Sequence, residues 1–216
     1  MSYTKAVIEL HYLPSIAYMA KLSHLEAVFF EAHENYSKRS FRNRAHILTS
    51  SGVQRLSIPL AKGKNEQMPI RQVKIANDQN WQINHWRSIR TAYSRAPFYD
   101  YYADEMTPIF EKTYTELFDW NLDLFKLICD LIGVEINWTL TSDYDRLYDE
   151  SVHDLRNTVT PQNWDRLNDR FFKSIPYAQV FQEKHGFVAN VSALDLLFCK
   201  GPEAAYYLEL CQNINY

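Results

Sequence analysis

Two short apolar segments separated by one helical segment restrict the fold of this chain more than any other feature. Residues 6–10 form an apolar strand candidate, and residues 27–30, Ala-Val-Phe-Phe, form a second without polar interruption. Pro14 suits the first turn of a helix over residues 15–22. Because strand, helix and continuous apolar strand open a parallel α/β unit, we expect the two strands to be parallel neighbours.

The pattern changes after residue 45. Residues 46–49 and 54–60 flank the turn sequence Ser50-Ser51-Gly52, and apolar and other residues alternate in the second segment. This predicts an antiparallel hairpin. A loop is expected at residues 62–65, and the alternation around Val73 and Ile75 predicts a third strand.

Helical periodicity begins at Trp81. The apolar stripe of the first helix consists of Trp86, Ile89, Tyr93 and Ala96, and Pro97 ends it. Further helices are expected over 101–114 and 116–132, followed by an alternating strand over 134–141 that returns to the same sheet. The predicted class is α/β (or α+β), with a small mixed sheet that opens with the parallel unit, an antiparallel hairpin, a helical cover and a short helical C-terminal region.

A change in composition divides the chain near residue 142. Residues 1–142 are expected to form the main α/β domain. Residues 143–216 form an acidic loop and a helical C-terminal region, packed on the same domain. Ser192-Ala193-Leu194-Asp195 reads as a capping box.

Several classes of protein are disfavoured by composition. The chain has 216 residues but five Gly, and it lacks the Gly-rich spacing of a dinucleotide loop. Its three Cys have no metal or redox spacing, which is typical of reduced thiols in the cytoplasm. No apolar stretch has transmembrane length, so we expect a cytoplasmic protein without direct membrane insertion.

Positive charge is concentrated in one segment of an otherwise acidic chain. Residues 37–99 contain twelve Lys or Arg against two acids, although the whole chain has a net charge of −3. Clustered charge costs self-repulsion, so it indicates an anionic ligand such as a phosphate or carboxylate. The alternative is that this segment neutralises acidic helices packed on it.

Arginines form two clusters in the basic segment. Arg39, Arg42 and Arg44 follow the second strand candidate, at the position where parallel α/β proteins bind ligands. Arg87 and Arg90 lie on a helix that has no acid at ion-pair spacing. We predict that all five bind a substrate anion in a shared pocket. In a purely structural interpretation they instead pair with distant acids, such as Asp104, Glu105, Asp119, Asp123 and Glu150.

Candidate catalytic side chains are few. His11 and Tyr12 end the first strand candidate, and with His85 they are predicted to transfer protons. Glu31, His33 and Glu34 lack a spaced His or Cys partner, so no metal is predicted. No cofactor is indicated, and no Ser or Cys has the setting of an activated nucleophile. The acidic net charge and the missing motifs argue against nucleic acid.

Motifs along nearly the whole chain resemble the WbqC-like family. They are Tyr12-Leu13-Pro14, the run from Lys38 to Arg44, His85-Trp86, Ala96-Pro97-Phe98-Tyr99, and Leu194-Asp195-Leu196 followed by Gly201-Pro202. The resemblance implies a role in making bacterial O-antigen, capsule or a similar surface polysaccharide. The family often has Gln-Pro where this chain has Glu9-Leu10, which puts a shared substrate in doubt.

Charge and resemblance together give one leading hypothesis. The protein binds a phosphorylated or nucleotide-activated substrate, an anionic small molecule, and transfers an acyl or aminoacyl group to an amino sugar. The alternative is a non-catalytic scaffold that presents an anionic intermediate to partner enzymes of a glycan pathway.

Overall fold

The parallel unit predicted at the N-terminus is confirmed. The structure, a computed structural model, describes residues 4–61, 67–165 and 172–212. Strands β1 (Lys5–Ile8) and β2 (Ala27–Phe30) are parallel, and helix α1 (Ile16–Leu22) joins them. Ser15 is the N-cap of α1, and its hydroxyl accepts a hydrogen bond from the Tyr18 N–H. The expected loop over 62–65 lies outside the described residues.

Two later strands complete the sheet. Strand β5 (Trp138–Leu140), from the predicted strand over 134–141, pairs with β2, and β6 (Val152–Asp154) pairs with β1. The order is β5-β2-β1-β6 with all pairings parallel. Strand β6 lies in a segment expected to be loop. Its three residues are too few to show a period, so the pairing comes from tertiary contact.

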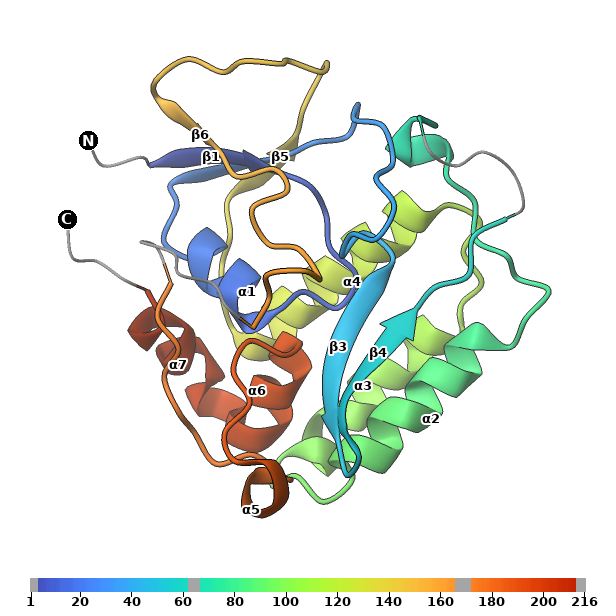
Figure 1. The fold of residues 1–216 in the computed structure, drawn as a ribbon, viewed down its shortest axis with the longest axis vertical. Helices are drawn as coiled ribbons and strands as arrows, with labels where there is room; N and C mark the ends of the chain where they lie inside the picture. The colour runs from blue at the N-terminus through green and yellow to red at the C-terminus, as the bar shows by residue number, and fades with distance from the viewer. Residues whose placement is uncertain (1–3, 62–66, 166–171, 213–216) are drawn as a thin grey trace.

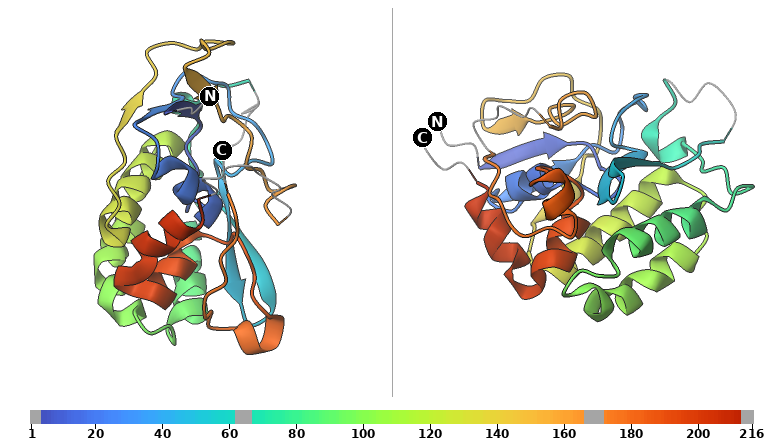
Figure 2. Two further views of the ribbon diagram at one scale, coloured as in Figure 1. Left: turned by 90° about the vertical axis from the view of Figure 1, so that its left-hand side faces the viewer. Right: turned by 60° about the horizontal axis from the view of Figure 1, so that its bottom comes forward.

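The two faces of this sheet are covered differently. Figure 1 shows α1 and α4 (Leu117–Ile132) on one side, where Phe30 packs edge-on against Phe125. Residues 141–151, yellow to orange in Figure 2, arch over the other side on the way from β5 to β6. A loop rather than a helix therefore closes the second face, next to the ends of the strands.

The predicted hairpin forms a sheet of its own. Strands β3 (Arg44–Thr49) and β4 (Gly52–Ser57) are antiparallel, and Gly52 adopts a φ of 99° in their turn. The third strand predicted at Val73 and Ile75 is wrong. A 3₁₀ turn, η1 (Ile70–Gln72), comes directly before Val73, and Lys74 and Ile75 form only isolated bridges, with Glu116 and Leu60.

Three helices cover the hairpin and the sheet. They are α2 (Trp81–Tyr93), α3 (Tyr99–Glu111) and α4. Ile89 and Tyr93 of the predicted stripe are buried, and the Tyr93 hydroxyl accepts a hydrogen bond from the Leu48 N–H. Gly133 caps α4 in the left-handed conformation, as predicted.

The C-terminal region contains α5 (Gln182–His185), α6 (Ala193–Lys200), η2 (Gly201–Glu203) and α7 (Ala204–Leu210). Ser192 is the N-cap of α6, but the predicted capping box is wrong. The buried Asp195 carboxylate instead accepts hydrogen bonds from the Tyr177 hydroxyl and the Gln179 amide. Among the described residues, no helix is both long and apolar enough to cross a bilayer.

Candidate functional site

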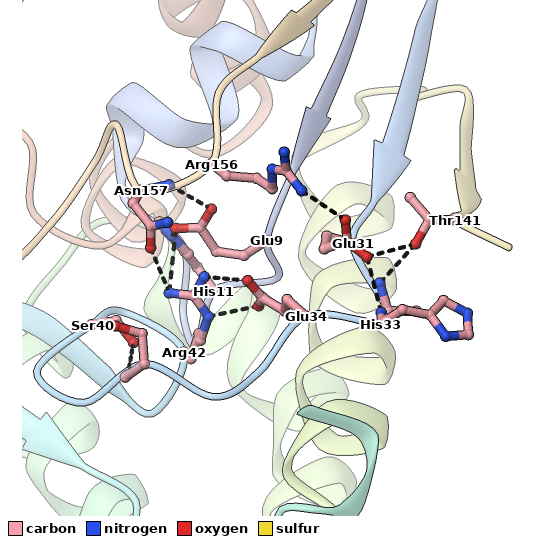
Figure 3. A network of polar contacts seen from close by, with 12 residues as sticks. Glu9, His11, Glu31, His33, Glu34, Ser40, Arg42, Thr141, Arg156 and Asn157 are labelled. Carbon is pink, nitrogen blue, oxygen red and sulfur yellow. Dashed lines mark hydrogen bonds and ion pairs between the residues drawn. The ribbon is translucent and has the colours of Figure 1, made fainter. Parts of the chain in front are cut away.

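Polar side chains follow the strands of the parallel sheet where each strand ends. Glu9 follows β1, Glu31 follows β2, Thr141 follows β5 and Asp154 ends β6. Parallel strands bring their carboxyl ends to one edge, which is where open α/β sheets bind ligands. Figure 3 shows the polar network at that edge as two neighbouring clusters, one around Arg42 and Glu9 and one around Glu31 and Arg156.

Arg42 and Glu34 form the centre of the network. Arg42 Nε donates to Glu34 Oε1 at 2.7 Å, and Nη2 donates to Oε2 at 2.5 Å. Arg42 Nη1 donates to the Asn157 side-chain oxygen at 3.1 Å and lies 3.7 Å from Glu9 Oε1. The Arg42 side chain is 1% exposed, so its charge is matched inside the protein.

Glu9 and His11 form the inner end of the network. Burial raises the pKa of Glu9, but Arg42, a hydrogen bond from His11 and the Asn157 N–H together lower it to about 2. Burial lowers the pKa of His11, so its ring is neutral. Its Nε2 lies 3.1 Å from Glu9 Oε1, and its buried Nδ1 has no partner among the described residues. Glu9 is therefore an ionised carboxylate held by its neighbours.

Glu31 and Arg156 anchor the loop over the sheet. Glu31 is fully buried and accepts hydrogen bonds from the Thr141 hydroxyl at 2.9 Å and from Arg156 Nη1 at 3.1 Å. Arg156 also binds Asp154 and lies over the rings of Tyr144 and Tyr148. The Arg156 guanidinium thus links the tyrosines of the loop over the second face of the sheet to the carboxylates at the strand ends.

A hollow of about 390 Å³ opens beside the Glu34–Arg42 pair. Its lining includes His33, Glu34, Ser37, Arg42, Arg146 and Asn157. Burial raises the pKa of Glu34, although the hydrogen bonds and charge of Arg42 oppose the rise. The hollow therefore presents a fixed carboxylate with increased proton affinity beside exposed His33 and Arg146.

Comparison with known proteins identifies the family. The model of the WbqC-like protein family matches residues 10–167. This chain belongs to the WbqC-like protein family. The uncharacterized protein Rv1507c of Mycobacterium tuberculosis is 30% identical over 230 residues, which cover 96% of this chain and 98% of that protein. No solved structure matches the chain.

The three candidate proton-transfer residues of this WbqC-like protein lie in its interior. His11 is 1% exposed, Tyr12 is 0% exposed and His85 is 8% exposed. The Tyr12 hydroxyl lies 2.9 Å from His85 Nδ1, and burial lowers the pKa of His85 to about 4. Neither residue of this pair lines the hollow beside Glu34. A role for them in proton transfer stays a prediction, and their geometry is that of paired core groups.

The five predicted anion-binding arginines do not gather in one hollow. Only Arg42 lines the hollow beside Glu34, while Arg87 and Arg90 are exposed on α2 and line two other depressions. Arg39 is exposed, and Arg44 lies at the start of β3. The shared pocket fails because α2 packs against β3, far from the strand ends. Anion binding by the separate clusters stays a prediction.

The acids weighed in the structural interpretation do not neutralise these arginines within the described residues. Asp123, for example, pairs with Lys112 and Lys126. The acids that pair with Arg42 are Glu9 and Glu34, and these two pairs were not predicted from the sequence. No group of three His, Cys, Asp or Glu side chains in the described part of the chain is placed to hold a metal.

Sequence reasoning missed four members of the network: Glu31 as an ion-pair partner, Thr141, Arg156 and Asn157. Glu31 comes directly after the predicted strand over 27–30 and Thr141 ends the predicted strand over 134–141, and these positions were a usable signal. Arg156 and Asn157 follow β6, which the sequence did not reveal, so no signal pointed to them.

Proposed function

We propose that this WbqC-like protein acts in the biosynthesis of a bacterial surface polysaccharide, in the cytoplasm, and binds a phosphorylated or nucleotide-activated sugar. Membership of the WbqC-like family supports this pathway, because the resemblance to that family implies a role in making surface polysaccharides. Three free buried cysteines support a reducing compartment. The single observation that carries the site is the hollow beside Glu34, at the carboxyl ends of the parallel strands.

The proposed reaction is transfer of an acyl or aminoacyl group to an amino sugar. Glu34 takes the proton that the attacking amine loses, the amine nitrogen bonds to the acyl carbon, and the bond to the donor's leaving group breaks. Two features support this role for Glu34. Burial raises its proton affinity, and Arg42 fixes both carboxylate oxygens.

A second candidate is a non-catalytic protein that holds an anionic intermediate for partner enzymes. The burial of His11, Tyr12 and His85 favours it, because none of these groups reaches the hollow. The two candidates differ in whether product forms, since a pure binder raises its melting temperature with ligand but releases nothing new.

The test is turnover by purified protein supplied with nucleotide-activated amino sugars and with acyl-thioester or aminoacyl-ester donors. Mass spectrometry should detect an acylated sugar, and Glu34→Gln should reduce its formation by roughly 10²–10⁴-fold, the usual contribution of a general base. His33→Gln serves as a control for change at an exposed neighbour. Equal turnover by wild type and Glu34→Gln would exclude Glu34 as the base, and stabilisation by sugars without product would favour the scaffold.

A further inference from the structure

The outward side of the β3–β4 hairpin concentrates positive charge. Arg44 lies opposite Ser57 and His46 lies opposite Arg55 in the antiparallel register. Directly opposed residues project from the same face, so Arg44, His46 and Arg55 share one side. The other side carries Ala45, Ile47 and Leu56, which are buried. On the arginine side Arg55 is exposed and Arg44 is half-buried, whereas Leu48, nearer the turn on the same side, is buried.

Arg39 lies in the loop before β3, and its charge acts on Arg44; we call Arg39, Arg44 and Arg55 the basic hairpin face. Partial burial lowers the pKa of Arg44, and charge repulsion from Arg55 and Arg39 lowers it further. Within the described part of the chain, Arg44 and Arg55 have no ion pair, and Arg44 Nε, although buried, has no acceptor. Among the residues that the structure describes, no ion pair with a carboxylate compensates these three like charges.

One acid does act on the neighbourhood. Asp165 raises the pKa of His46, while burial, Arg55 and Arg44 lower it, and the net result is about 4. The His46 ring is therefore neutral and contacts Trp164 edge-on, with ring centroids 4.8 Å apart. Arg55 and Arg44 together outweigh Asp165, so the neighbouring charges give a positive electrostatic potential at the His46 ring.

We propose that the basic hairpin face binds the phosphoryl or diphosphate group of a small anionic ligand. This deepens the proposed function, because it locates the phosphate of the activated sugar outside the hollow beside Glu34. The loop between β2 and β3 contributes to both the hollow and the basic hairpin face. Its Ser37 and Arg42 line the hollow. Arg39, in the same loop, and Arg44, at the start of β3, belong to the basic hairpin face.

Planar guanidinium groups suit a tetrahedral oxyanion because each can donate two parallel hydrogen bonds. Glu34 and Asn157 already accept hydrogen bonds from Nε, Nη1 and Nη2 of Arg42, and the charge of Arg42 is compensated by Glu34. An anion at the face would relieve the repulsion between Arg44 and its two basic neighbours, so binding and charge compensation act in the same direction.

The test is calorimetric titration with inorganic pyrophosphate. We expect Arg55→Gln, which changes an exposed side chain, to weaken binding by roughly ten- to hundredfold. Arg95→Gln removes the same charge from an exposed position outside the face and should leave the affinity within about twofold. Equal weakening by the two variants would mean general charge attraction and would overturn the proposal.

Histidine NMR gives a second readout that does not depend on calorimetry. Pyrophosphate at the face should raise the pKa of His46 from its low value of about 4, and Arg55→Gln should reduce the ligand-induced rise. A pKa of His46 that is unaltered by saturating pyrophosphate would overturn the location.

Two further arms identify the source of the phosphate. A uridine diphosphate sugar should bind at least as tightly as pyrophosphate, whereas vesicles rich in phosphatidylglycerol should not bind. Stronger binding to vesicles than to the soluble diphosphate would overturn the proposal in favour of a membrane surface. Arg55→Gln leaves the Glu34–Arg42 pair unchanged, so its effect on pyrophosphate affinity tests the phosphate site whether or not the protein shows turnover.

Discussion

Glu34 and Arg42, both in the loop that follows β2, form a bidentate ion pair, in which the two hydrogen bonds from the guanidinium to the carboxylate oxygens are 2.7 Å long or shorter. The Glu34 side chain is 7% exposed and the Arg42 side chain is 1% exposed, so both charged groups are almost completely shielded from solvent. Buried pairs of this kind gain little over apolar residues, but they are costly to break from one side. The pair therefore fixes the conformation of the loop and the orientation of Glu34.

The first prediction concerns Arg42. Arg42→Ala should lower the free energy of unfolding by about 3–5 kcal/mol, because Glu34 and Glu9 would remain buried without their counter-ion. Urea denaturation measures the loss. Arg95→Ala, which removes an exposed charge, should stay within about 0.5 kcal/mol of wild type. The double variant Arg42→Met, Glu34→Leu should recover part of the loss; an equally unstable double variant would contradict the ion-pair explanation.

The second prediction concerns Glu9, the buried carboxylate that follows β1. The folded pKa of Glu9, about 2, lies below its ordinary value of 4.5, so the group stabilises the fold above pH 4.5. About 3 kcal/mol of this stabilisation is lost as pH falls from 4.5 through 2. Glu9→Gln should flatten the stability profile in that window. Parallel profiles for the two proteins between pH 5 and 2.5 would contradict the assigned pKa.

The third prediction concerns Arg156. Arg156→Ala leaves the fully buried Glu31 without its guanidinium partner, so we expect a loss of about 3 kcal/mol. The loss should be greatest locally, with faster hydrogen exchange in β6 and in residues 141–151 than in α4. Arg146→Ala changes an exposed arginine of the same segment and should leave that exchange unchanged. Uniform acceleration across the chain would argue against a local anchor.

The fourth prediction concerns Gly201, the residue between α6 and α7. Its φ is 52°, and a Cβ there would overlap the ring of Phe98. Gly201→Ala should therefore destabilise the protein by about 2–4 kcal/mol, from overpacking and backbone conformation together. Gly133→Ala, with a φ of 78° and open space around it, should cost only about 1 kcal/mol. Equal losses in thermal denaturation would show that the ring contact is unimportant.

Local patterns predicted the local structure of this chain. The apolar segment at 27–30 identified β2, the turn at Ser50-Ser51-Gly52 identified the hairpin, and Ser192 identified the start of α6. Strand β6 was missed because three residues carry no period. The predicted third strand was wrong because four alternating residues, 72–75, are too few to distinguish a strand from a 3₁₀ turn followed by isolated bridges.

The candidate site was harder to predict because its members are distant in sequence. Charge alone predicted that Arg42 binds an anionic ligand. In the structure its hydrogen-bond partners are Glu34, eight residues before it, and Asn157, 115 residues after it. Only the fold shows that these groups meet. That Arg44 and Arg55 share one side of the hairpin, in contrast, follows from strand alternation once the register is known.

The central position of β1 affects how the protein is made. Strand β2 follows β1 after one short helix and can pair with one side of it soon after both are made. The other side of β1 has no partner until Val152–Asp154 is made, so an open strand edge persists while the intervening residues are synthesised. Nascent chains that stall before this segment would expose that edge to mispairing, and we expect them to depend on chaperones.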